Sequence, residues 1–158
     1  VIDAFEFNNP SSDSRFGAQD VAKNYYLSSY HQASESFEFL FNKDFFDDLD
    51  ADLQAILKYA VEAVSTSNTA LAMDNYSADL RKLQTESGVN VRRTSKELLD
   101  AQLKAWDQLI AELEKDAFMK KVMDSQREWV ERVTYYEIMN SPDYTLAYEH
   151  YFPGKLAL

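Results

Sequence analysis

The longest uninterrupted segment of the sequence runs from Asp50 to Ser87 without a proline or a glycine. Apolar residues recur in it at the three- and four-residue spacing of a helix that buries one face. Asp50 can accept the free amide hydrogens at its start, and Gly88 is typical of a residue just past a helix end. The residues of the polar run 65–69 prefer caps and turns. The segment 50–87 is therefore predicted to form either one long helix or two shorter helices.

Further helices are predicted after residue 94. Thr94 and Glu97 have the spacing of a capping box, and apolar residues follow them at helical spacing. Asp116 can begin the next helix, and Pro142 can occupy the first position of the last one. The predicted helices are 95–114, 116–139 and 142–151, with a short helix over 13–24.

Three short segments are predicted as strands. Residues 1–8 alternate imperfectly between apolar and acidic side chains before Pro10, residues 36–42 alternate phenylalanines with other residues, and 89–92 is a brief candidate. Residues 25–34 carry aromatics without a period and are predicted as a loop or extended segment. Because the chain opens inside an alternating segment and without a methionine, we expect further sequence upstream.

The composition limits the classes of partner and chemistry. The chain has 158 residues, is 46% hydrophobic and carries a net charge of −11. This length is enough for one core. The acidic balance argues against nucleic acid, because a phosphate backbone requires a basic surface. No run approaches the roughly 18 apolar residues that span a bilayer. The absence of cysteine excludes disulfides and leaves the redox compartment open.

Residues typical of catalytic sites are sparse. His31 and His150 do not have metal-ligand spacing, and there is no glycine-rich phosphate loop or nucleophile motif. The sequence therefore offers no constellation for an enzyme. Glu6 stands out because it lies beside Phe5 and Phe7 near the end of a predicted strand, where ligand crevices form in α/β folds. A structural ion pair or a surface position is the alternative for Glu6.

The aromatic residues Tyr25, Tyr26 and Tyr30 also have two interpretations. They can pack a loop onto the core, or they can form an apolar wall whose hydroxyl groups face an oxygen-rich ligand. The pattern alone favours packing. Tyr30 is the residue of this group that we take as a candidate substrate contact.

Four segments, taken in order, resemble the C-terminal half of a substrate-binding protein of tripartite ATP-independent periplasmic (TRAP) transporters: IDAFEF, VAKNYY, FLFNKDFFDDLDADLQAIL and LRKLQTESGVNV. The likeness is closest to the branch that captures 2-oxo acids, lactate and similar small carboxylates. It implies an α/β chain, helix-rich with a few strands, that forms the C-terminal half of a two-lobed periplasmic-binding-protein-like fold. It also implies a periplasmic protein that is not an enzyme and that delivers a small organic acid to TRAP membrane subunits.

The resemblance assigns roles to few residues of this chain. Glu6 matches an acidic residue that helps to hold a cation beside the ligand, and Phe7 occupies the next position, usually Trp, whose backbone oxygen contributes. Gln32 lies where a second acidic ligand is often found, and its uncharged amide favours sodium or no metal over calcium. The carboxylate-binding Arg of the family belongs to the other half. The candidate substrate contacts are thus Phe7 and Tyr30, and the candidate metal ligands are Glu6, Phe7 and Gln32.

Two further expectations concern partners. In the 2-oxo acid branch, long C-terminal helices can exchange between subunits, so the resemblance allows a homodimer. An alternative from another class is a helical protein–protein interaction domain without a small ligand, since the apolar stripes from Asp50 onward would serve it equally well. That alternative does not explain the phenylalanine-rich and N-terminal segments that precede the helices.

Overall fold

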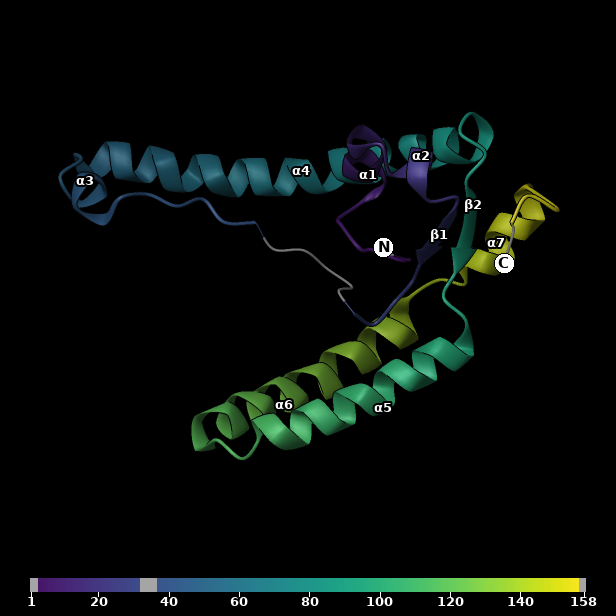
Figure 1. Ribbon diagram of the computed structural model, residues 1–158. Coiled ribbons are helices and arrows are strands. Elements are labelled where there is room, and N and C mark those ends of the chain that lie inside the picture. Colours follow the sequence, from purple (N-terminus) through teal and green to yellow (C-terminus); the bar gives the residue numbers. More distant parts are fainter. Residues whose placement is uncertain (1–2, 32–36, 157–158) are drawn as a thin grey trace. The chain divides into compact units, whose positions relative to one another are not determined.

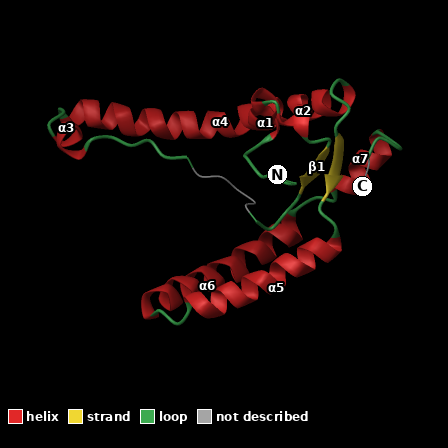
Figure 2. Ribbon diagram, viewed as in Figure 1, coloured by secondary structure: helices red, strands yellow, loops and turns green. Residues whose placement is uncertain are grey.

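The computed structural model describes residues 3–31 and 37–156, and helices predominate in them (Figures 1 and 2). By its contacts the chain forms two units. Unit 1 comprises Val1–Tyr25 and Ser34–Val91, and unit 2 comprises Tyr26–Ala33 and Arg92–Leu158. The helices are α1 (Pro10–Phe16), α2 (Ala18–Val21), α3 (Lys43–Asp47), α4 (Ala51–Thr85), α5 (Lys96–Leu113), α6 (Ala117–Asn140) and α7 (Tyr144–Tyr151), and the strands are β1 (Asn24–Leu27) and β2 (Asn90–Arg93).

The two strands pair with each other. The amide of Asn90 donates to the carbonyl of Lys23 at 2.7 Å, and the amide of Thr94 donates to the carbonyl of Leu27 at 2.8 Å. Residue numbers increase together along both strands, so the pair is parallel. β2 lies where the sequence predicted a strand at 89–92, whereas β1 lies in a segment predicted as a loop or extended.

The long helix α4 is a single helix through the polar run that could have divided it. The hydroxyl groups of that run donate to carbonyls one turn earlier: Thr66 to Glu62 at 3.0 Å, and Ser67 to Ala63 at 2.7 Å. Such bonds satisfy the hydroxyl groups without breaking the backbone ladder. Gly88 follows the helix with φ of 64°, a left-handed conformation that glycine adopts without strain.

Three predicted helix starts are corrected by the structure. Asp50 occupies the N-cap of α4, but its side chain makes no capping hydrogen bond. Ser95 rather than Thr94 caps α5, because the Thr94 hydroxyl donates to the carbonyl of Leu27 instead. Asp143 caps α7, so Pro142 precedes the helix and does not occupy its first position.

The short helix predicted over 13–24 is also wrong in extent. α1 begins earlier, at Pro10, and ends before Gly17, whose φ of 84° is left-handed. A residue in that conformation cannot continue a right-handed helix, so α2 begins afresh at Ala18. The chain has already entered β1 by Asn24.

Two predicted strands are absent from the described residues. Residues 3–8 have no regular secondary structure, and the amide of Asn8 donates to the side chain of Asp13 at 3.2 Å, which removes it from any strand ladder. Residues 37–42 also have no regular structure. There the ring of Phe41 lies 5.8 Å from that of Phe46 in α3, so Phe41 packs on a helix turn, while Phe37 and Phe39 are exposed.

Buried side chains are few among the described residues, and they gather in unit 1. Leu83 near the end of α4, Val89 and Pro10 are the buried apolar residues there, and Ser11 and Asp13 of α1 are buried polar ones. α1 packs on α4. Polar groups therefore share the core of unit 1, and such groups are stable there only when they are hydrogen-bonded.

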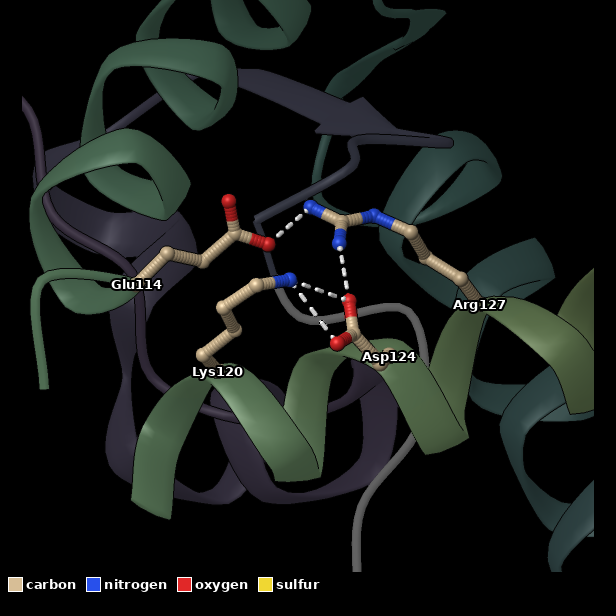
Figure 3. Close-up of polar contacts among 4 residues, drawn as sticks. All are labelled: Glu114, Lys120, Asp124 and Arg127. Carbon is tan, nitrogen blue, oxygen red and sulfur yellow. Dashed lines mark hydrogen bonds and ion pairs between the residues drawn. The ribbon is translucent and has the colours of Figure 1, made fainter. Parts of the chain in front are cut away.

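In unit 2, α5 and α6 lie side by side, joined by a short turn (Figure 1). Asp116 caps α6 by accepting the amide hydrogen of Met119 at 2.8 Å. Figure 3 shows the charged cluster beside the turn, in which Arg127 pairs with Glu114 and also contacts Asp124 at 3.1 Å. The pKa of Asp124 lies below its usual value, chiefly because Lys120 donates hydrogen bonds to the carboxylate.

Candidate functional site

Glu6 and Phe7 lie in the irregular segment that leads into α1, in unit 1. Both side chains are exposed. The Phe7 ring stacks on Phe16 at the end of α1, with 5.2 Å between ring centroids and 28° between ring planes. The ring of Phe7 is thus oriented by a neighbour while 52% of the residue stays accessible. A half-exposed aromatic ring of this kind can contact a ligand.

The start of α1 is fixed by its own polar residues. The side-chain oxygen of Asn9 accepts two amide hydrogens of the first turn at 3.1 and 3.0 Å. The amide of Asn9 donates to the hydroxyl group of Ser12 at 3.2 Å, which completes a capping box. Because this box begins two residues after Phe7, it sets the direction in which the chain that carries Glu6 and Phe7 enters the helix.

Asp13 connects α1 to the start of β1. Its carboxylate accepts the amide hydrogen of Asn8 at 3.2 Å and the hydroxyl hydrogen of Tyr25 at 2.6 Å. Burial of the Tyr25 hydroxyl, followed by the hydrogen bond and charge of Asp13, raises the pKa of Tyr25 well above its ordinary value. Tyr25 therefore serves the packing of unit 1, the first of its two interpretations.

Tyr30 lies in unit 2, in the segment after β1, and α5 holds the backbone of that segment. The amide of Tyr30 donates to Oε1 of Gln102 at 3.0 Å, and Nε1 of Trp106 donates to the Tyr30 carbonyl at 3.3 Å. Nε2 of Gln102 also donates to the hydroxyl group of Ser29 at 2.8 Å. The backbone is thus fixed from one helix, while Tyr30 itself is 47% exposed.

The turn into this segment is made by Ser28, whose φ of 66° is left-handed. A residue other than glycine in that conformation is uncommon, and strained backbone is frequent where ligands are bound. The strain at Ser28 is consistent with the hydrogen bonds from Gln102 and Trp106, which hold the two residues that follow.

Sequence reasoning singled out neither Gln102 nor Trp106 as a contact of the candidate site. Their spacing of four residues places both on one face of α5, where their side-chain groups meet the segment that carries Tyr30. The sequence signal for this contact was a glutamine and a tryptophan four residues apart, which places two hydrogen-bonding side chains on one face of a predicted helix.

The predicted metal ligands are only partly described. Glu6 and Phe7 offer a carboxylate and a backbone oxygen from consecutive positions, and Gln32 lies outside the described residues. Among the described residues, no group of three or more His, Asp or Glu side chains is placed to hold a metal ion. Hard cations such as calcium take six to eight oxygen ligands. The two described donors therefore supply only part of a cation site.

An open hollow of about 470 Å³ lies between α1 and α4, within unit 1. Phe7 is part of its wall, so one predicted contact residue lines a described cavity. The α1 side is formed by Phe7, Asn9, Ser11, Ser12, Arg15 and Phe16, and the α4 side by Asn68, Ala72, Asn75 and Tyr76. Apart from Phe7, sequence reasoning singled out none of these residues.

The class of protein follows from a comparison with known families. Residues 1–121 match the family of bacterial extracellular solute-binding proteins, family 7 (DctP). The match covers most of the chain and includes Glu6, Phe7, Tyr30 and Gln32. Such proteins are transport proteins with a periplasmic-binding-protein fold, and the helix-rich structure with two parallel strands is compatible with a part of that fold.

The chain belongs to this family of TRAP solute-binding proteins. Its members are periplasmic, bind small solutes and interact with TRAP membrane subunits. No solved structure matches the chain. Within the described ranges, none of the helices has the length and apolarity that a membrane span requires.

Proposed function

We propose that this protein captures a small organic acid, such as a 2-oxo acid or lactate, and that residues 6, 7, 30 and 32 contact the acid or its cation. The observation that carries the proposal is the family match over residues 1–121, which includes all four positions. The orientation of the Phe7 ring by Phe16 and the fixed backbone at Tyr30 support it. Side chains that are held in place before binding lose less entropy when a ligand arrives.

The proposed solute also has an electrostatic requirement. Two carboxylates about 4 Å apart repel by roughly 4 kcal/mol at an effective dielectric constant near 20. If Glu6 faces the solute carboxylate, a cation between them would offset that repulsion. We propose sodium for this position, with oxygen ligands from Glu6, Phe7, Gln32 and the solute, because the amide of Gln32 adds no charge.

The membrane subunits would recognise the solute-bound protein by its conformation. A ligand shifts an equilibrium between open and closed forms only by its difference in affinity for the two. We propose that the organic acid favours a closed form, which the TRAP membrane subunits recognise.

The first experiment measures the melting temperature of the intact protein with a panel of 2-oxo acids, lactate and dicarboxylates. At least one acid should raise the melting temperature in a concentration-dependent way, because a ligand that binds only the folded state stabilises it. The matched amide or alcohol of the same carbon skeleton is the control. No stabilisation by any acid of the panel would contradict the proposal.

The cation is tested separately by calorimetric titration with the active acid, in sodium and in choline buffers of equal ionic strength. Weaker binding in choline is expected, and the Glu6→Gln variant should lose most of the difference between the two buffers. Equal affinity in both buffers for the unmodified protein would remove sodium from the proposal and leave the acid in place.

A homodimer is the proposed oligomeric state. The C-terminal part of α6 leaves four large apolar residues exposed within the described chain: Tyr135, Tyr136, Ile138 and Met139. Burying such residues against a second copy would remove apolar surface from water. Light scattering of the intact protein should give twice the mass of one chain, and a monomer at all concentrations would contradict a homodimer.

A further inference from the structure

The parallel pairing of β1 with β2 stops before the segment that carries Tyr30. At the end of β1, the carbonyl of Leu27 accepts hydrogen bonds from both the amide of Thr94 at 2.8 Å and its hydroxyl group at 2.9 Å. Ser95 then caps α5, so the chain that formed β2 turns into a helix. The backbone groups that follow Leu27 therefore need other hydrogen-bond partners.

Side chains of α5 supply these partners. Oε1 of Gln102 accepts the amide hydrogen of Tyr30 at 3.0 Å, and Nε1 of Trp106 donates to the Tyr30 carbonyl at 3.3 Å. Both backbone groups of Tyr30 are thus engaged by one helix, as a neighbouring strand would engage them in a sheet. Because Gln102 and Trp106 are four residues apart, they lie one turn from each other on the same face of α5.

Gln102 holds more than one residue of the segment. Oε1 of its side chain accepts from Tyr30, while Nε2 donates to the hydroxyl group of Ser29 at 2.8 Å. The same hydroxyl oxygen accepts the amide hydrogen of His31 at 3.0 Å. Ser28, which precedes them, has a left-handed φ of 66°. A residue other than glycine keeps that conformation only where the surrounding contacts hold it.

A contribution to the core does not explain these contacts. Tyr30 is 47% exposed and Trp106 is 38% exposed. Hydrogen bonds in such surroundings add little to the stability of a fold, because water replaces them when they break. They do fix the backbone of a segment whose aromatic side chain stays accessible. A contact that is ordered before a ligand arrives loses less entropy on binding, so these hydrogen bonds should affect affinity more than stability.

We propose that Gln102 is a positioning residue for the solute site and that it acts through Tyr30. Its side-chain amide takes the place of a strand neighbour beyond the end of β1 and holds the Tyr30 backbone so that the phenol ring is presented to the solute. Trp106 completes this clamp at the Tyr30 carbonyl. The solute contact of Tyr30 rests on the proposed function, whereas the clamp lies wholly within unit 2.

The clamp is first tested without a solute, by hydrogen exchange of the Tyr30 amide in the intact protein, followed by nuclear magnetic resonance. This amide should exchange at least about tenfold more slowly than one that is open to water. Gln102→Leu should abolish the protection, whereas Gln102→Glu keeps an oxygen acceptor and should retain most of it. Gln108→Leu, at an exposed position further along α5, is the matched control and should leave the protection unchanged. Equal exchange of Tyr30 in the unmodified protein and in Gln102→Leu would overturn the proposal.

The effect on binding is measured by calorimetric titration with pyruvate, the smallest 2-oxo acid. Gln102→Leu should weaken pyruvate binding about tenfold, because the Tyr30 segment must then be ordered at the moment of binding. Trp106→Phe removes the indole donor and keeps an aromatic ring, so it should weaken binding by a smaller factor. Gln108→Leu should bind pyruvate like the unmodified protein. Unchanged pyruvate affinity in Gln102→Leu would overturn the positioning role.

A double-mutant cycle separates positioning from a general loss of structure. In the Tyr30→Ala background, which has no phenol ring to position, Gln102→Leu should change pyruvate affinity less than about twofold. General damage would instead weaken binding by the same factor in both backgrounds, and that result would overturn the proposal. If the unmodified protein binds neither pyruvate nor any other acid of the panel, the proposed function fails, and the exchange of the Tyr30 amide still decides whether Gln102 fixes this segment.

Discussion

Two regions of the molecule are held by side-chain contacts of similar chemistry in different surroundings. At α1, Asp13 is 6% exposed, and its carboxylate accepts hydrogen bonds from Asn8 and Tyr25. At the turn between α5 and α6, the side chains of Arg127 and Asp124 are about half exposed. A buried acceptor leaves its donors unsatisfied when it is removed, whereas exposed partners return to water. The number of polar contacts in a region is therefore a poor guide to how much they stabilise the folded protein.

The largest effect is expected from Asp13→Ala. This variant leaves the Asn8 amide and the partly buried Tyr25 hydroxyl without their acceptor, so the free energy of unfolding should fall by about 2 kcal/mol. Urea denaturation followed by circular dichroism measures it. Asp20→Ala, at an exposed position of α2, is the control and should change stability little. A loss below about 1 kcal/mol at Asp13 would erase the difference between the two regions.

The second prediction concerns pH. The pKa of Tyr25 is raised in the folded state, chiefly by burial, so folding favours the neutral phenol. This contribution is complete below the ordinary tyrosine pKa of about 10 and is lost as the pH rises above it. Tyr25→Phe should lower stability by about 1.5 kcal/mol at pH 7 and by less at higher pH. The exposed Tyr26→Phe is the matched control, and identical pH profiles for the two variants would contradict the burial of Tyr25.

A third prediction compares two helix caps of the same residue type. Asn9 accepts two amide hydrogens at the start of α1, whereas Asn42 accepts one, from Phe45 at 3.0 Å, at the start of the exposed α3. Asn9→Ala should lower the free energy of unfolding by about 1 kcal/mol. Asn42→Ala should lower it by only about a third as much, because α3 is short and contributes little to the core. The same urea titration measures both, and a larger loss at Asn42 would reverse the expected order.

The smallest effect is expected from Arg127→Ala. It removes the pairs with Glu114 and Asp124 (Figure 3). The Asp124 side chain is about half exposed, and Oε1 is the buried atom of a Glu114 side chain that is 25% exposed, so the loss should stay below about 1 kcal/mol. The difference between the variant and the unmodified protein should shrink further in high salt. A salt-independent loss above about 2 kcal/mol would show that the cluster behaves like a buried network.

The long helices of this protein follow from local sequence. The predicted ranges 50–87, 95–114 and 116–139 differ from α4, α5 and α6 by one or two residues at each end. Apolar spacing, polar caps and the lack of proline and glycine act within a few residues, so they can be read directly. Gly17 shows the limit, since one left-handed residue divided a helix that the pattern treated as continuous.

The strands were less predictable because a strand requires a partner. Alternating apolar residues at 37–42 have no ladder, and β1 formed instead where no period is visible, since Asn24 to Leu27 can pair with β2. Residues 3–8 form no strand for a second reason: the amide of Asn8 donates to the carboxylate of Asp13 and is not available to a partner strand. Both outcomes depend on contacts outside the segment itself.

The residues of the candidate site also fall into two groups, those that the sequence indicated and those that only the structure revealed. Glu6, Phe7, Tyr30 and Gln32 were selected from the sequence, and their contact with a solute stays a prediction. Gln102 and Trp106 act on the backbone of Tyr30 through hydrogen bonds that join residues more than 70 positions apart. The amides of α4 that line the hollow carried a weak signal, since polar residues at helical spacing are ordinarily a solvated face.

The sequence by itself determined the helices, their approximate ends and the family resemblance, because these depend on neighbouring residues and on the order of short segments. Only the tertiary structure decided which polar groups are buried and which remain available. Asp13 and Arg15 lie two residues apart on α1, yet one is enclosed by Tyr25 and Asn8 and the other lines an open hollow. Burial of a side chain depends on what the distant parts of the chain place around it.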